Sequence, residues 1–124
     1  MGELEELRLE TRTFAEARDW GPFHTPKNLA MAVAGEAGEL VAEFRWLTAE
    51  ESAPDRLAVE HRRAIEFEMA DVLIFLLRLA DVLDVDLADV VRAKLAANES
   101  RFPPVRWRAY GSVRRDGRDW TAAP

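Results

Sequence analysis

The fold is decided by residues 68–83, which read EMADVLIFLLRLADVL. No proline or glycine interrupts this stretch, and its apolar part, residues 72–77, leaves no polar side on a helix that turns by about 100° per residue. A helix that is apolar on every side needs neighbours all round. The stretch therefore predicts a central helix, over residues 57–83, in an all-α, four-helix bundle-like fold.

Three further helices are expected around the central one. Their limits are set by residues that start or stop helices: a Gly-Pro pair, a Thr-Pro pair that suits an N-cap followed by proline, an Asp N-cap and a final Pro-Pro pair. The expected helices cover residues 3–19, 26–47 and 87–101. We expect one helical domain over residues 1–104 and an irregular C-terminal tail over residues 105–124.

Composition limits the class of partner. The chain has 124 residues, a net charge of −6 and no cysteine. An acidic protein does not attract a polyanion, so no nucleic acid polymer is expected as a partner, whereas a single nucleotide is not excluded. Without cysteine there is neither a disulfide framework nor thiolate chemistry. No apolar run has the length of a membrane span and the start does not resemble a signal peptide, so we expect a cytoplasmic protein.

The central helix also predicts self-association. A chain this short can hardly surround it with its own helices, and soluble monomers seldom expose a contiguous apolar patch. We expect a homo-oligomer, either a dimer or a tetramer. The alternative is a monomeric bundle in which the other helices cover the central one.

Two expected helices carry paired carboxylates. Glu36 and Glu39 lie three residues apart, as do Glu68 and Asp71, and such residues are neighbours on one helix face. Both pairs share an arc with apolar side chains, where an unpaired carboxylate is costly unless a cation or metal ion neutralises it. Oxygen-only ligands favour Mg²⁺, with Mn²⁺ as a substitute. The alternatives are pairing with Arg78 or Lys94, or a solvated acidic face.

Small residues surround the first acidic pair. Gly35 and Gly38 lie inside an expected helix, where each costs about 1 kcal/mol relative to alanine. Such a helix suits the close approach of another backbone or of a ligand.

These residues resemble the MazG-like all-α nucleotide pyrophosphohydrolase superfamily, whose signature is Glu-x-x-Glu, a loop, then Glu-x-x-Asp. Among its members the chain looks most like the dCTP pyrophosphatase branch. Further stretches carry that likeness: Trp20, residues 23–29, residues 35–40, Trp46, residues 71–74, Lys94, Asn98 and residues 101–103.

The resemblance implies Mg²⁺-dependent hydrolysis of a (deoxy)nucleoside triphosphate, dCTP or a modified dCTP-like nucleotide, to monophosphate and pyrophosphate. It implies that the four carboxylates bind metal, and we expect Glu39 to be the general base. The expected substrate contacts are Trp20, His24, Asn28, Trp46, Phe75, Lys94, Asn98 and Arg101. Phe75 stands where the branch commonly has tyrosine, so one hydroxyl contact to the nucleotide is lost.

Two other interpretations stay open. The chain could be a non-catalytic helical module that binds a nucleotide or metal for regulation. It could also be the same class of enzyme acting on dUTP or another damaged nucleotide.

Overall fold

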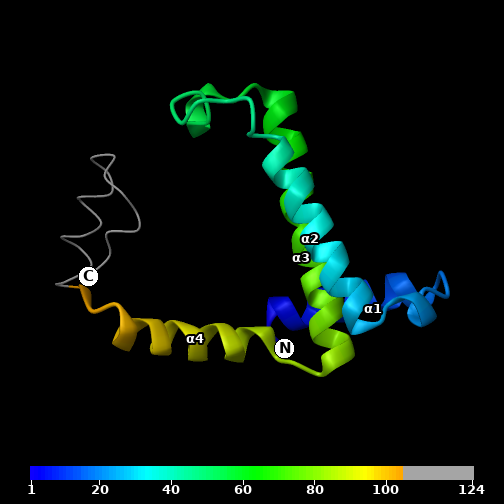
Figure 1. The fold of residues 1–124 in the computed structure, drawn as a ribbon. Coiled ribbons are helices and arrows are strands. Elements are labelled where there is room, and N and C mark those ends of the chain that lie inside the picture. The colour runs from blue at the N-terminus through cyan, green and yellow to red at the C-terminus, as the bar shows by residue number, and fades with distance from the viewer. Residues whose placement is uncertain (105–124) are drawn as a thin grey trace. The chain divides into compact units, whose positions relative to one another are not determined.

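The structure, a computed structural model, describes residues 1–104 and has four α-helices and no strand in that range (Figure 1). The α-helices are α1 (Glu3–Glu16), α2 (Pro26–Ala42), α3 (Val59–Leu83) and α4 (Leu87–Arg101), and the short 3₁₀ helices are η1 (Gly21–Phe23) and η2 (Pro54–Arg56). The predicted all-α class with four helices is confirmed. The expected irregular tail lies outside the described residues.

The chain divides into two compact units, residues 1–87 and residues 88–124. The first unit contains α1, α2 and α3, and α4 falls almost entirely in the second. The single domain expected over residues 1–104 stays a prediction. Among the described residues, no helix is both long enough and apolar enough to cross a bilayer.

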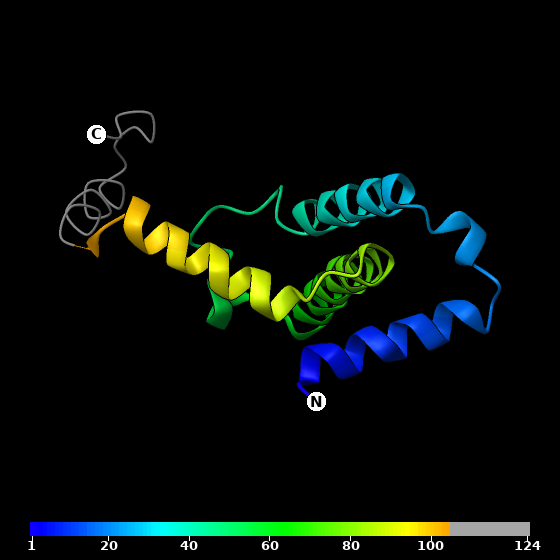
Figure 2. The same ribbon diagram turned by 90° about the horizontal axis from the view of Figure 1, so that it is seen from below.

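Helix α3 is the centre of the first unit. It packs against α2 on one side and against α1 on another (Figure 2). The buried apolar core comes from all three helices: Ala15, Leu29, Ile65, Leu77 and Ala80. The sequence-based placement of α3 at the centre is therefore confirmed for this unit.

Helices α1 and α2 nevertheless cover α3 only in part. Phe67 and Met69 are each 56% exposed and Ile74 is 42% exposed. The apolar surface that motivates an oligomer is thus present among the described residues, and the oligomer itself stays a prediction.

Helix α2 begins as predicted and ends early. The Thr25 hydroxyl accepts a hydrogen bond from the backbone N–H of Asn28 at 3.2 Å, and Pro26 follows as the first helical residue. The helix ends at Ala42 rather than near Leu47. Beyond Ala42 backbone N–H groups donate to the carbonyl three residues earlier, from Phe44 to Val41 at 3.0 Å and from Leu47 to Phe44 at 2.9 Å. The chain therefore leaves the α-helix in tight turns.

Helices α1 and α3 end in the same way. Asp19 and Asp84 adopt left-handed backbone conformations, with φ of 53° and 54°. The next residue then donates back across the last turn, Trp20 to Ala15 O at 3.1 Å and Val85 to Ala80 O at 2.8 Å. This termination reverses the chain. After α1 it leads directly into η1, which carries Trp20 and His24 on its flanks.

Candidate active site

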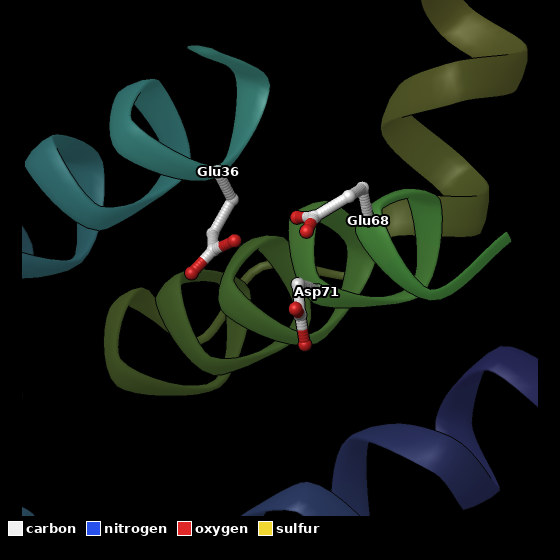
Figure 3. Close-up of side chains that lie close together, drawn as sticks. All are labelled: Glu36, Glu68 and Asp71. Atoms are coloured by element: carbon white, nitrogen blue, oxygen red, sulfur yellow. The ribbon is translucent and has the colours of Figure 1, made fainter. Parts of the chain in front are cut away.

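Three carboxylates from two helices converge where α2 crosses α3. Glu36 comes from α2, and Glu68 and Asp71 come from α3 (Figure 3). Each offers an oxygen that lies within 4.8 Å of the other two, and all three side chains are half-buried. Carboxylate oxygens at this spacing can share one hard divalent cation.

The electrostatics of the cluster fit a cation. Burial is the largest influence that raises the pKa of Glu68, followed by the negative charges of Glu36 and Asp71. One carboxylate oxygen of Glu68, Oε2, is buried and has no hydrogen-bond partner among the described residues. An orphaned buried oxygen beside two other acids is the arrangement that a bound Mg²⁺ or Mn²⁺ would satisfy.

The fourth predicted ligand, Glu39, lies outside this group of three. Its side chain is exposed, although its charge also contributes to raising the pKa of Glu68. Residues three apart on an α-helix differ by about 60° in direction, so one can face the neighbouring helix while the other lies at the rim. The role of Glu39 stays a prediction.

Arg78, one of the two cations considered as alternative partners of the acidic cluster, does not pair with it. Arg78 binds Asp81 instead, with Nη1 at 2.7 Å from Oδ2. Arg78 lies seven residues after Asp71, about 10 Å along the helix, which is too far for an ion pair. Asp81 is only one turn away.

An apolar cavity of about 340 Å³ lies between α1, η1 and α3. On α3 it is lined by Ile74, Phe75 and Arg78, which follow Asp71 by three, four and seven residues and share its face of the helix. The cavity is therefore next to the acidic cluster along α3. Its complete lining is Leu7, Glu10, Thr11, Phe14, Ala15, Trp20, His24, Ile74, Phe75 and Arg78.

Aromatic rings form one wall of the cavity. The Trp20 ring packs edge-on against Phe14, with centroids 5.7 Å apart, and lies 6.0 Å from the His24 ring. Rings arranged in this way offer faces and edges on which a planar ligand can stack.

Comparison with known protein families shows which family has this arrangement of residues. The family sequence model of the MazG nucleotide pyrophosphohydrolase domain matches residues 24–106. The chain belongs to this family. The chain is 41% identical over 100 residues to dCTP pyrophosphatase 1 of Bos taurus and 42% identical to that of Homo sapiens. Both matches cover 81% of this chain and 59% of the relative, so the chain spans about three fifths of the length of these proteins.

Two further proteins resemble this MazG chain. A dATP/dGTP diphosphohydrolase of Cyanophage S-2L is 38% identical over 76 residues, which is 61% of this chain and 63% of that protein. The crystal structure of a pyrophosphatase from Archaeoglobus fulgidus superposes with a TM-score of 0.75 at 36% identity, covering 83% of this chain and 94% of that one. The family match gives the chain the MazG fold.

Three of the predicted substrate contacts meet in the MazG chain's cavity: Trp20, His24 and Phe75. Asn28 does not line it. Its side-chain amide donates to the Phe23 carbonyl at 3.0 Å and so braces η1. Trp46 follows the end of α2, is 84% exposed and has the Arg45 guanidinium 5.3 Å from its ring centroid.

The other three predicted contacts lie on α4. Lys94, Asn98 and Arg101 are spaced by four and three residues, so they share one face of that helix. Because α4 belongs to the second unit, their part in the site stays a prediction.

Several lining residues escaped the sequence analysis. Those on α1, such as Leu7 and Phe14, belong to a helix without an acidic motif, and nothing in its pattern says which face meets α3. Arg78 did leave a signal, because it is the one charged residue within the run from Val72 to Ala80. A cation in such a run must be paired, but the sequence did not indicate that its partner is Asp81.

Proposed function

We propose that this chain hydrolyses a deoxynucleoside triphosphate, dCTP or a dCTP-like nucleotide, to the monophosphate and pyrophosphate in the presence of Mg²⁺. One observation carries the proposal: the three-carboxylate cluster and the aromatic-lined cavity follow each other along one face of α3. A nucleotide has its triphosphate and its base at opposite ends of the sugar, which suits a site that is acidic at one end and apolar at the other.

The carboxylates would hold the ion. Glu36, Glu68 and Asp71 supply oxygen ligands, and Glu39, one turn along α2, is proposed as a further ligand and as the general base. When bound, Mg²⁺ screens phosphate oxygens and lowers the pKa of water. The chain itself contributes orientation, because its ligands come from two packed helices, and a base close enough to accept a proton. A water oxygen would bond to the α-phosphorus and give its proton to Glu39, while the bond from the α-phosphorus to the bridging oxygen of the leaving pyrophosphate breaks.

The cavity would hold the nucleobase of the substrate. Trp20 and Phe75 offer ring faces for stacking, and His24 offers a ring nitrogen for a hydrogen bond. A volume of about 340 Å³ is near the lower end of ligand pockets, which span about 300–1,000 Å³, and suits one small base. The substrate named for the mammalian relatives is dCTP, whereas the phage relative is named for dATP and dGTP. The relatives thus favour cytosine and leave the purines to be tested.

Three residues of α4 are further candidates for substrate contact. We propose that Lys94 and Arg101 contact phosphate oxygens and that Asn98 reads a base edge, because the three share one face of α4. We also propose that a second copy of the chain covers the exposed apolar side chains of α3, such as Phe67 and Met69, giving a dimer or tetramer.

Pyrophosphate release from a panel of triphosphates tests this function. The panel should hold dCTP, 5-methyl-dCTP, dUTP, dATP, dGTP and dTTP, each with Mg²⁺, with Mn²⁺ and with EDTA. We expect metal-dependent release that is fastest with a cytosine nucleotide. Release that is fastest with dUTP would assign the substrate differently. No release from any triphosphate, combined with binding of dCTP, would favour the non-catalytic module.

A further inference from the structure

One charged side chain in the wall of the cavity is buried. Arg78 is only 7% exposed, although it stands among apolar and aromatic groups. Its guanidinium makes two directed contacts. Nε donates to Nδ1 of His24 at 3.0 Å, and Nη1 donates to Oδ2 of Asp81 at 2.7 Å. A buried arginine with both contacts satisfied is held in one position.

Asp81 is itself held from a second helix. Its side chain is 6% exposed and binds Arg8 and Arg12 of α1 as well as Arg78. Nε of Arg12 lies 3.0 and 2.9 Å from the two carboxylate oxygens. Since three guanidinium groups surround this carboxylate, Arg78 cannot turn away without leaving part of the network unpaired.

The contact with Arg78 decides which nitrogen of His24 carries the proton. Arginine is always charged and can only donate. The accepting Nδ1 must therefore be unprotonated, so the ring is neutral and its hydrogen is on Nε2. Burial, with the charge of Arg78 as the second cause, lowers the pKa of His24 and favours the same neutral ring.

We propose that Arg78 is a positioning residue that fixes His24 as an Nε2–H donor in the cavity, and that the site thereby selects a base with a hydrogen-bond acceptor opposite His24. This step rests on the proposed function in one respect, namely that the cavity binds the base. A carbonyl oxygen or an unprotonated ring nitrogen meets the requirement, and cytosine carries both side by side. A base with an N–H at that point would face another donor and leave both groups unpaired.

Nitrogen chemical shifts of the histidine rings test the first half of the proposal without any substrate. The chain has two histidines, so His61 is an internal reference in the same spectrum. In the wild-type chain at neutral pH we expect His24 as a single species with hydrogen on Nε2. In Arg78→Met we expect a mixture of ring forms, since the donor to Nδ1 is gone. Asp81 keeps Arg8 and Arg12 in this variant, so the fold should survive, as circular dichroism can verify.

Arg63→Met is the matched control. It makes the same replacement on the same helix, at a side chain that is 65% exposed. That side chain forms a 3.7 Å ion pair with Glu66 and lies 4.3 Å from the centroid of the Phe67 ring, away from His24 and the cavity. Its His24 signals should equal those of the wild type. A wild-type His24 with hydrogen on Nδ1, or identical His24 signals in wild type and Arg78→Met, would overturn the proposal.

Kinetics with dCTP test the second half. Because Arg78 acts on base binding through His24 and lies away from the carboxylates, Arg78→Met should raise KM about threefold to tenfold and leave kcat within about twofold, the scale of one hydrogen bond. Arg63→Met should change neither constant. A lowered kcat at unchanged KM would overturn the assigned role. A wild type without activity on any triphosphate would refute the proposed function instead, and the nitrogen shifts would still decide the pairing of Arg78 with His24.

Discussion

Replacing Asp81 by asparagine should destabilise the first unit strongly at neutral pH. The variant keeps the size of the side chain and removes the charge that three arginines share. Removing one partner of a buried ion pair lowers the free energy of unfolding by about 3–5 kcal/mol. We expect the lower end, about 3 kcal/mol, because the Arg12 side chain is 39% exposed and partly solvated. Domains are stable by only about 5–15 kcal/mol, so this is a large fraction.

Urea unfolding followed by circular dichroism measures the effect. With a slope of about 2 kcal/mol per M, a loss of about 3 kcal/mol moves the midpoint down by about 1.5 M. The matched control is Asp55→Asn, because Asp55 lies in the same unit as Asp81 and is exposed. That variant should unfold within about 0.5 kcal/mol of the wild type.

The pH dependence gives the sharpest check. The hydrogen bond from Arg12, with the charges of Arg12, Arg8 and Arg78, lowers the pKa of Asp81 below its ordinary value of 3.8, against the opposing effect of burial. A lowered pKa means that the stabilisation is fully present above pH 3.8 and is lost as the pH falls through the pKa of the folded state. The gap between wild type and Asp81→Asn should therefore close in acid. A gap that is small at pH 7, or that persists in acid, would refute the reasoning.

Three other outcomes are expected. EDTA should abolish pyrophosphate release and added Mg²⁺ should restore it, and release that is indifferent to chelation would exclude the metal mechanism. Asp71→Asn or Glu39→Gln should lower kcat by at least about a hundredfold with the fold intact. Glu66→Gln, on a 47% exposed side chain, should change kcat little. Near-normal turnover of Asp71→Asn or Glu39→Gln would remove that residue from the site. Phe67→Glu, at a 56% exposed apolar side chain of α3, should reduce the mass seen by light scattering at micromolar concentration and lower activity with it. A wild type that is already a fully active monomer would contradict the proposed assembly.

The acidic motifs and the central helix could be read from the sequence because both are local. A helix places residues three apart on neighbouring directions and makes an uninterrupted apolar run central, whatever the rest of the chain does. For the same reason Glu36, Glu68 and Asp71 could be expected to meet once two helices pack. The small difference in direction that leaves Glu39 at the rim depends on how α2 crosses α3, which no pattern in either helix encodes.

The network around Asp81 could not be predicted, because it depends on contacts between distant segments. Arg8 and Arg12 lie more than sixty residues from Asp81, and on α1 alone they look like ordinary surface cations. Gly35 and Gly38 were expected to suit the close approach of another backbone or of a ligand, and within the described residues no other backbone makes that approach. A Cβ atom at either position would meet nothing within 4 Å, so these glycines leave open space beside the acidic cluster.

The cavity between α1, η1 and α3 has a consequence for divergence within the family. The MazG match begins at residue 24, so it includes every carboxylate of the cluster but none of the wall that α1 contributes. Substitutions at Leu7, Glu10 or Phe14 can accumulate without altering a single metal ligand. We therefore expect homologous proteins to differ in nucleobase preference through substitutions in the first helix while they keep the same carboxylates.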